Sequence, residues 1–384
     1  MENILIVGGT SGIGWALANQ LAGRKEVNEV HIVGRTLHDE IKNSKIKFYA
    51  HNVLVDNINY LEQFRNIDTL IITIGGGRVA QFDNLLKKEI DLEIDLNYKC
   101  VVSILKQFYK KIMGQKTFRV AVISSIAGMI NSPLFSVYAS SKAGVSSLIE
   151  SLNIELEMNG TNNRILDVKP GHIPGTRFGN NKKIDKHPAL DLAVEIIDAL
   201  ENKKTQLIPN YDTVYKSVID RNHNDSHEFG INSYEYKIKN NRLTEKPQIK
   251  IGYMSGTFDL FHIGHLNMLK KAKQYCDYLV VGVHKDASHK NKTVFIPLEE
   301  RMEIVRSIKY VDEVIVSRPE DSDVREIIPY NYLFVGSDYK GTERFKRYEK
   351  QFSKLDDVRI IYFPYTKSTS STQLRNAISI DNNK

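Results

Sequence analysis

The order of apolar and polar positions along the chain predicts two α/β units in tandem. Up to about residue 210, short apolar runs alternate with longer segments of helical periodicity, and the runs read ILIVGG, EVHIVGR, TLIITIGGG, RVAVISS and RILDVKPG. Strands that alternate with helices are typical of a parallel sheet with right-handed crossovers. Residues 1–220 are therefore predicted to form a doubly wound parallel sheet of the Rossmann type.

A polar segment separates this unit from a second alternation. Residues 221–247 are rich in Asn and end in Pro247, and they are predicted to be a linker because they offer too few apolar side chains for a core. The strand-like runs then resume as IKIGYMSG, YLVVGVH, EVIVS, YLFVGS and RIIYFPY. Residues 248–384 are predicted to form a smaller, Rossmann-like α/β domain.

Composition narrows the class of protein. A chain of 384 residues can hold two domains with separate cores. Since no apolar run approaches the roughly 20 residues that span a bilayer and the start lacks a signal-peptide pattern, we expect a cytoplasmic protein. Cys100 and Cys276 are too far apart in sequence to indicate a disulfide framework. The net charge of +7 is spread over many lysines, which favours anionic small molecules over nucleic acid.

A glycine-rich turn follows the first predicted strand and precedes a helical segment, WALANQLAG. Glycine allows a tight turn and close backbone approach, and a helix N-terminus favours a pyrophosphate. The turn is therefore a candidate dinucleotide site, with a plain tight turn as the alternative. Its candidate binding residues are Gly8, Thr10, Ser11, Gly12, Ile13 and Gly14.

The end of the second predicted strand indicates which dinucleotide is bound. A site for NAD usually carries an acidic residue there, which accepts hydrogen bonds from the ribose. Arg35 occupies this position and Thr36 follows it. Because a guanidinium group suits a 2′-phosphate, NADPH is the predicted cofactor. A solvated Arg35 without a ligand is the alternative.

Three side chains further along are candidates for carbonyl reduction. Tyr138 and Lys142 are four residues apart on a predicted helix and so share a face, and Ser125 ends the preceding strand. Tyr138 would donate a proton to the carbonyl oxygen, and Ser125 would bind that oxygen. Lys142 would lower the Tyr138 pKa and hold the nicotinamide ribose. Asn97 is expected to hold a water that relays protons to Lys142.

Residues 1 to about 215 resemble the short-chain dehydrogenase/reductase family. The resemblance rests on a glycine-rich turn, an Asn, a Ser and a Tyr-x-x-x-Lys pair in this order, matched by Gly8, Gly12, Gly14, Asn97, Ser125, Tyr138 and Lys142. It implies cofactor contacts from Asn52, Tyr138, Lys142, Pro170, Gly171 and Thr176. Two positions depart from the family: Thr73-Ile74-Gly75-Gly76 replaces Asn-Asn-Ala-Gly, and Asn52 replaces an Asp near the adenine.

The segment IPGTRFGNNKKIDKHP lies where this family places its substrate loop. It contains four cationic side chains: Arg177, Lys182, Lys183 and Lys186. One hypothesis is a solvated surface. The other is a clamp for a phosphate group on the ketone substrate.

A pair of histidines at a predicted helix N-terminus marks the second half. His262 and His265 follow the strand IKIGYMSG, with Gly264 between them. Because no third ligand lies nearby in the sequence, a metal site held by these side chains is not expected. Both imidazoles are predicted instead to donate hydrogen bonds to triphosphate oxygens during displacement at the α-phosphorus.

Residues 248 to about 378 resemble the glycerol-3-phosphate cytidylyltransferase family. The matching stretches are GTFDLFHIGH, EERMEIVRSIKYVDEVI, VGSDYKG and YFPYTKSTSSTQLR. The resemblance implies that His262, His265 and Lys292 act in catalysis and that Mg²⁺ bridges triphosphate oxygens. It further implies nucleotide contacts from Thr257, Phe258, His262, His265, Lys290, Lys292, Tyr365, Thr366, Thr369, Ser370, Ser371 and Thr372.

Two departures leave the acceptor of this second half open. Lys309 and Tyr365 each stand where the family has Arg, so two bidentate donors are lost. An adenylyltransferase for pantetheine phosphate or nicotinamide nucleotide is the alternative within the class.

The two halves together predict a bifunctional enzyme. The expected reaction reduces ribulose 5-phosphate with NADPH and couples the polyol phosphate to CTP, giving CDP-ribitol for surface polysaccharide such as a capsule. CDP-glycerol or another CDP-polyol is an alternative product, and a non-catalytic regulatory or oligomerising half is the alternative from another class. A homodimer or larger homo-oligomer is expected.

Overall fold

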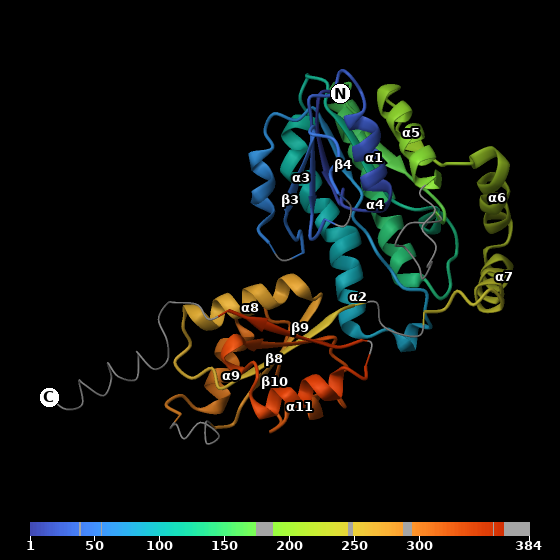
Figure 1. The fold of residues 1–384 in the computed structure, drawn as a ribbon. Coiled ribbons are helices and arrows are strands. Elements are labelled where there is room, and N and C mark those ends of the chain that lie inside the picture. The colour runs from blue at the N-terminus through green and yellow to red at the C-terminus, as the bar shows by residue number, and fades with distance from the viewer. Residues whose placement is uncertain are drawn as a thin grey trace. The chain divides into compact units, whose positions relative to one another are not determined.

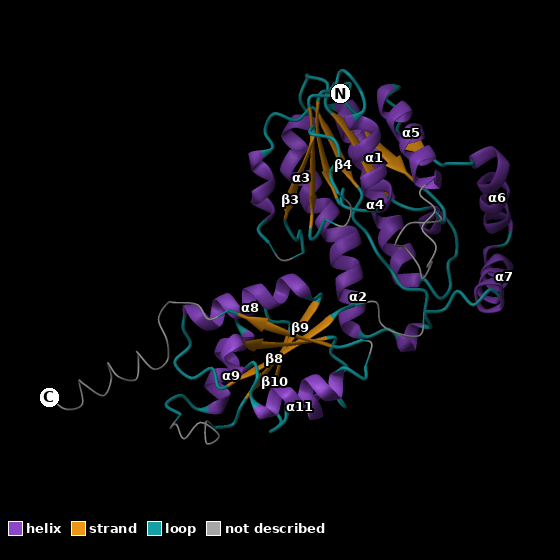
Figure 2. Ribbon diagram, viewed as in Figure 1, coloured by secondary structure: helices purple, strands orange, loops and turns teal. Residues whose placement is uncertain are grey.

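A computed structural model of the chain describes residues 1–37, 40–54, 56–173, 187–244, 249–286, 294–355 and 357–364. The chain divides into two compact units, Met1–Pro247 and Gln248–Lys384. Figure 1 follows the chain through both units, and Figure 2 shows that each unit has strands in its interior and helices outside. The predicted fold, two α/β units with parallel sheets, is confirmed.

The described part of the first unit contains a seven-stranded parallel sheet in the order β3-β2-β1-β4-β5-β6-β7. Its central strands are buried on both faces, which explains why they read as continuous apolar runs. The strands are β1 (Asn3–Val7), β2 (Glu29–Gly34), β3 (Ile46–Ala50), β4 (Thr69–Ile72), β5 (Arg119–Ile123), β6 (Ile165–Val168) and β7 (Gln206–Leu207).

Helices cover both faces of this sheet. Alternate side chains of β1 enter different cores: Ile4 and Ile6 pack with α1 (Gly12–Ala22) and α5 (His187–Glu201), whereas Leu5 and Val7 pack with the helices of the other face. Those helices are α3 (Cys100–Ile112) and α4 (Ser136–Met158). α2 (Lys87–Ile94) runs into α3 through a π-helical turn, Asp95–Lys99.

Residues 221–247, which were predicted to be a linker, are mostly helical in the structure. α6 (Lys216–Asn224) and α7 (Ser226–Lys239) belong to the first compact unit. Figure 1 shows them at the outer edge of this unit. Asn131 connects these helices to the rest of the unit, since its Nδ2 donates to the Ser226 carbonyl at 2.8 Å. The polar composition rules out a separate core for this segment, but it does not prevent exposed helices that a neighbouring loop holds in place.

The described part of the second unit contains a five-stranded parallel sheet in the order β10-β9-β8-β11-β12. α8 (Ile263–Tyr275) and α9 (Leu298–Arg306) pack on one face, and α10 (Asp321–Val324) and α11 (Glu343–Phe352) pack on the other. The strand order reverses between β8 and β11, and such switch points bind ligands at the carboxyl ends of the strands. The strands are β8 (Ile251–Gly256), β9 (Tyr278–Val283), β10 (Glu313–Val316), β11 (Tyr332–Gly336) and β12 (Arg359–Phe363).

A search of the described helices finds none with the length and apolar character needed to cross a bilayer.

Arg78 and Glu89 form a buried ion pair at the start of α2. Their side chains are 3% and 4% exposed, and Arg78 Nη2 lies 2.8 Å from Glu89 Oε2. Arg78 also donates to the carbonyl of Thr244, and Glu89 accepts a hydrogen bond from the Leu86 N–H. Removing one member of such a pair leaves the other charge buried without compensation.

Glu89→Ala is therefore expected to lower the free energy of unfolding of the first unit by about 3–5 kcal/mol. Trp15 is the one tryptophan of the chain and lies in α1, so its fluorescence during urea titration reports this unit. The double variant Arg78→Met/Glu89→Leu removes both charges and should lose less stability than the single variant. A single variant as stable as the wild-type protein would contradict this expectation.

Candidate active sites

The glycine-rich turn has the geometry of a phosphate-binding loop. Gly8 has a φ of +98° and Gly12 a φ of +54°, which favour glycine. A Cβ on Gly14 would lie 2.6 Å from the Gly8 carbonyl oxygen, so the turn closes only without a side chain there. Ser11 makes no side-chain cap to α1, so the first N–H groups of the helix can serve an anionic ligand.

Arg35 lies next to this turn. It follows β2 directly and is exposed, and a Cβ on the preceding Gly34 would be 2.7 Å from Thr10 Cγ2. The end of β2 and the Thr10 side chain of the turn are therefore in contact, and Thr36 follows Arg35 and is exposed. Asn52 is engaged in its own loop, where its Oδ1 accepts a hydrogen bond from the Leu54 N–H at 3.2 Å.

Tyr138, Lys142 and Ser125 converge as the sequence predicted, because α4 follows β5 across one end of the sheet. Lys142 Nζ lies 5.7 Å from the centroid of the Tyr138 ring and donates to the Ile123 carbonyl at 2.9 Å. Tyr138 also stacks on Phe135 with centroids 4.3 Å apart. A phenol, an ammonium group and a hydroxyl therefore meet at the ends of β5 and α4.

Burial is the main cause of the pKa shifts of Tyr138 and Lys142. It raises the pKa of Tyr138 to about 12, while a hydrogen bond with Ser125 acts to lower that pKa and the Glu93 carboxylate acts to raise it. Burial also lowers the pKa of Lys142 to about 8, opposed by Asp167. The raised pKa of Tyr138 differs from the lowered pKa that we expected beside Lys142, because desolvation dominates, and the phenol stays protonated at neutral pH.

Asn97 holds the backbone opposite these residues. Its side chain is fully buried, its Oδ1 accepts from the Gly76 N–H at 2.9 Å, and its Nδ2 donates to the Gly76 carbonyl at 2.7 Å. It lies in the π-helical turn between α2 and α3, a distortion often found at functional sites. The side-chain amide is thus used on the backbone, and the relay water stays a prediction.

The turn Pro170–Gly171 follows β6 at the same end of the sheet. The Pro170 carbonyl accepts a hydrogen bond from the Ile126 N–H at 3.1 Å, which joins this turn to the Ser125 region. A Cβ on Gly171 would lie 1.6 Å from Tyr215 Oη, so Tyr215 closes over the turn. Sequence reasoning missed Tyr215, because nothing in its surroundings relates it to a turn 44 residues earlier.

In the second unit, the loop after β8 is held in a strained conformation. Phe258 and Leu260 have φ values of +52° and +50°, which residues with side chains rarely adopt and which cluster at ligand sites. Asp259 stabilises the loop by accepting hydrogen bonds from the N–H groups of Phe295 and Ile296.

Arg301 supports the same loop from α9. It is 1% exposed and donates to the backbone carbonyls of Ile296, Thr257, His284 and Lys285. Neither Asp259 nor Arg301 was singled out from the sequence as a supporting residue. The sequence could not reveal the role of Arg301, because its hydrogen-bond partners are backbone carbonyls. Every residue has a backbone carbonyl, so no residue type marks such a partner.

His262 and His265 lie together at the start of α8, with ring centroids 4.0 Å apart. The Gly264 N–H donates to His262 Nδ1 at 3.0 Å, and the His262 N–H donates to His265 Nδ1 at 3.4 Å. Because each Nδ1 accepts, the neutral form of each ring carries its proton on Nε2. Burial lowers the pKa of His262, which favours this neutral form. The pair is therefore arranged to donate through Nε2.

The side chains of Thr257 and Phe258, both predicted to contact the nucleotide, have different surroundings. Thr257 Oγ1 is buried and has no hydrogen-bond partner among the described residues. The Phe258 ring is 4% exposed and packs 5.3 Å from the His265 ring, within the core under α8. Phe258 therefore packs its side chain against His265, and its contact with the nucleotide stays a prediction.

Two family models match the chain. The model described as short chain dehydrogenase matches residues 2–187, and the model described as cytidylyltransferase-like matches residues 253–377. The second unit belongs to the cytidylyltransferase family, and the first unit matches the short chain dehydrogenase model over residues 2–187. We therefore name the two compact units the dehydrogenase unit and the cytidylyltransferase unit.

Known relatives cover the units separately. A glycerol-3-phosphate cytidylyltransferase of Bacillus subtilis is 36% identical over 128 residues, covering 32% of this chain and 93% of that protein. An ethanolamine-phosphate cytidylyltransferase of Dictyostelium discoideum is 43% identical over 99 residues, covering 24% of this chain and 28% of that protein. A solved short-chain dehydrogenase of Streptomyces avermitilis is 19% identical with a TM-score of 0.49, covering 63% of this chain and 100% of that one.

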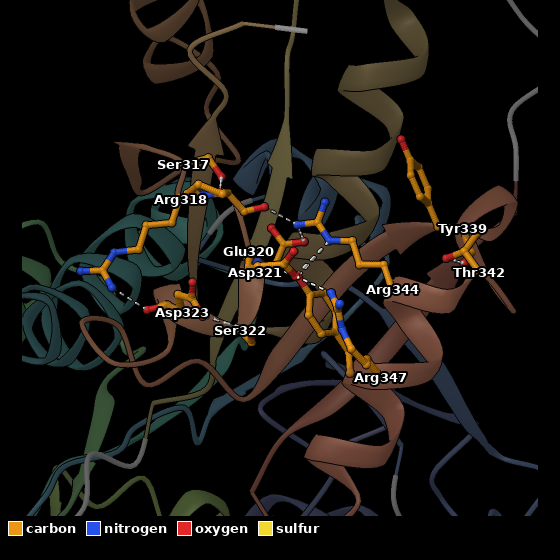
Figure 3. Close-up of polar contacts among 12 residues, drawn as sticks. Ser317, Arg318, Glu320, Asp321, Ser322, Asp323, Tyr339, Thr342, Arg344 and Arg347 are labelled. Atoms are coloured by element: carbon orange, nitrogen blue, oxygen red, sulfur yellow. Dashed lines mark hydrogen bonds and ion pairs between the residues drawn. The ribbon is translucent and has the colours of Figure 1, made fainter. Parts of the chain in front are cut away.

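The cytidylyltransferase unit has a second polar cluster beyond the ends of β10 and β11 (Figure 3). Arg344 donates to the Pro319 carbonyl at 2.7 Å and to Tyr348 Oη at 2.9 Å. Asp321 lies beside it, with its Oδ2 3.4 Å from Arg344 and its Oδ1 buried without a partner in the described part of the chain. The sequence did not indicate this cluster, since its members come from two crossovers that meet only in the fold.

Several predicted site residues lie outside the described residues. They are Thr176, Arg177, Lys182, Lys183, Lys186, Lys290, Lys292, Tyr365, Thr366, Thr369, Ser370, Ser371 and Thr372. Their roles stay predictions. In the part of the chain that the structure does describe, no three His, Cys, Asp or Glu side chains come together as a metal site.

Proposed function

We propose that the chain synthesises a CDP-alditol in two steps, for use in surface polysaccharide. The dehydrogenase unit would reduce ribulose 5-phosphate with NADPH, and the cytidylyltransferase unit would couple the resulting ribitol 5-phosphate to CTP. The observation that carries the proposal is the presence of two intact candidate sites, the Tyr138 group and the histidine pair, on one polypeptide. The phosphate of the first product is the nucleophile that the second step requires.

The first step is a proton and hydride transfer to a ketone. NADPH, when bound, supplies the hydride, and the Gly8–Gly14 cradle and Arg35 would hold its pyrophosphate and 2′-phosphate. Tyr138 donates its phenolic proton to the carbonyl oxygen, which Ser125 orients by a hydrogen bond. Lys142, close to the Tyr138 ring, is a cation that stabilises the negative charge left on the phenol.

The second step is a displacement at phosphorus. A phosphate oxygen of the polyol phosphate attacks the α-phosphorus of CTP, the bond to the β-phosphate oxygen breaks, and pyrophosphate leaves. His262 and His265 donate from Nε2 to the oxygens on which charge builds. Mg²⁺ would enter bound to CTP and would neutralise part of the triphosphate charge, because this ion prefers phosphate and water ligands to a cage made only of protein.

Two observations support the proposed acceptor class: the names of the matched relatives and two substitutions. The matched cytidylyltransferases are named for glycerol 3-phosphate and ethanolamine phosphate, both phosphorylated alcohols. Lys309 and Tyr365 replace two expected arginines, and Lys309 Nζ instead lies 5.0 Å from the Tyr310 ring centroid. This departure favours an acceptor other than glycerol phosphate. We place the reaction in the cytoplasm and expect a homodimer or larger homo-oligomer.

The proposal is tested by mass spectrometry of the products formed from separate ketose phosphates with NADPH, CTP and Mg²⁺. Ribulose 5-phosphate should give CDP-ribitol, with one NADPH oxidised and one pyrophosphate released for each product. Formation of CDP-glycerol from dihydroxyacetone phosphate alone would select the alternative substrate. Pyrophosphate release without any NADPH oxidation would make the first unit a non-catalytic module, and a preference for ATP over CTP would favour an adenylyltransferase.

A further inference from the structure

Residues Gly75–Arg78 form a strap that crosses the catalytic side chains of the dehydrogenase unit. A Cβ on Gly75 would lie 2.9 Å from Lys142 Nζ, and a Cβ on Gly77 would lie 2.7 Å from the Tyr138 ring. The backbone therefore touches both residues, and a side chain at either glycine would displace them. In this chain the close approach leaves no room for a side chain at Gly77.

The strap is pinned by two side chains that are four residues apart along α2 and its π-helical continuation. Asn97 binds both backbone groups of Gly76, as described above. Glu93 Oε1 accepts a hydrogen bond from the Arg78 N–H at 2.9 Å. One peptide unit thus separates the Glu93 carboxylate from the glycine that contacts the Tyr138 ring.

Other contacts hold the strap whatever the state of Glu93. The Arg78 guanidinium is buried against Glu89 and donates to the Thr244 carbonyl at 2.8 Å. The Val79 carbonyl accepts from the Thr244 N–H at 2.9 Å, and the Ala80 N–H donates to the Leu134 carbonyl at 2.8 Å. A neutral carboxyl at Glu93 could also still accept the Arg78 N–H through its carbonyl oxygen.

The environment of Glu93 suits a group that titrates. Burial raises its pKa to about 7; the Arg78 N–H and guanidinium act to lower it, and the charge of Glu89 acts to raise it. In the described part of the chain, the charged or titratable groups that face Glu93 are Arg78, Glu89 and Tyr138. Glu93 as a residue is half-buried.

We propose that Glu93 is a positioning residue of the dehydrogenase site: it tethers the strap over Tyr138 and Lys142, and its negative charge makes the Tyr138 phenol a weaker acid. This inference rests on the proposed reductase activity. Glu93 has no contact with substrate assigned to it and acts through Tyr138.

The sign of the effect follows from the two roles. When Glu93 loses its proton, the tether strengthens slightly, but the strap is already held elsewhere, so this gain is small. The new negative charge opposes the negative charge that develops on Tyr138 as it gives up its proton, which makes the phenol a weaker acid. The field effect therefore dominates, and reduction slows as the pH rises through the pKa of Glu93.

The test compares pH profiles of kcat/KM for reduction of a ketose without a phosphate group, so that no substrate ionisation intervenes. The wild-type rate should fall by about fivefold as pH rises through about 7. Glu93→Gln keeps the acceptor for the Arg78 N–H without the charge, so the step near pH 7 should vanish. Only the later fall should remain, as Lys142, whose pKa burial lowers to about 8, loses its charge. Glu93→Ala should be slower than Glu93→Gln at every pH, because only the alanine variant loses the acceptor for the Arg78 N–H.

Asp91→Asn is the matched control, since Asp91 is an exposed carboxylate on the same helix, and it should keep the wild-type profile. A Glu93→Gln variant that retains the step, or that is merely slower at all pH values, would overturn the proposal. Infrared difference spectra between wild type and Glu93→Gln add a readout without substrate. A Glu93 carboxyl band should titrate near neutral pH, and a band that titrates at the ordinary Glu pKa would overturn the proposal even if no ketose is reduced.

Discussion

Tyr138→Phe should lower NADPH-dependent ketose reduction by about three orders of magnitude, within the range for loss of a general acid. The substitution removes only the hydroxyl, which is the proton donor to the developing alkoxide. The ring remains to stack on Phe135 and to fill the space beside Gly77. The measurement is the rate of NADPH oxidation with one ketose phosphate and without CTP. It is made at neutral pH, where the phenol of the wild-type protein is protonated.

The second unit provides the internal control for this variant. Pyrophosphate release from CTP and added ribitol 5-phosphate should proceed at the wild-type rate, because the Tyr138 group belongs to the other compact unit. Trp15 fluorescence should show an unchanged unfolding transition of the dehydrogenase unit. A reduction rate within tenfold of wild type would show that another group protonates the alkoxide and would remove Tyr138 from the catalytic role.

His265→Ala should reduce CTP-dependent pyrophosphate release by about 10²- to 10³-fold, the usual cost of losing one donor to a developing oxyanion. His265 contributes in two ways. It accepts the His262 N–H through Nδ1, which fixes the first turn of α8, and it presents Nε2 to the triphosphate. Both contributions are lost together, so kcat should fall more than KM rises. The measurement is a coupled pyrophosphate assay with ribitol 5-phosphate and CTP.

A substitution elsewhere on α8 separates this loss from helix destabilisation. Gln274→Ala changes an exposed residue near the end of the same helix and should leave the rate unchanged. NADPH oxidation by the His265→Ala protein should also be unchanged. Equal losses in His265→Ala and Gln274→Ala would mean that helix stability, and not a donor at the reacting phosphate, explains the effect.

Much of the fold could be predicted from the sequence because the central strands of both sheets are buried on both faces. ILIV and TLII are continuous apolar runs for that reason, and the helices between them carry one apolar face each. The convergence of Tyr138 with Lys142 was predictable too, since four residues make about one helical turn. The segment 221–247 was not, because its helices depend on hydrogen bonds to Asn131 and not on an apolar pattern of their own.

The sequence by itself determined the two-unit α/β plan, the glycine-rich turn, the Tyr138–Lys142 pair and the histidines at the start of α8. Each of these is local: its residues are neighbours in the chain or one helical turn apart, so periodicity and spacing suffice. The fold decided which ring nitrogen of His262 carries the proton, why the Tyr138 pKa is raised, and that Glu93 and Asn97 pin a glycine strap over the catalytic side chains. These features depend on burial and on hydrogen bonds to backbone groups far away in the chain, and neither is written in the spacing of residue types.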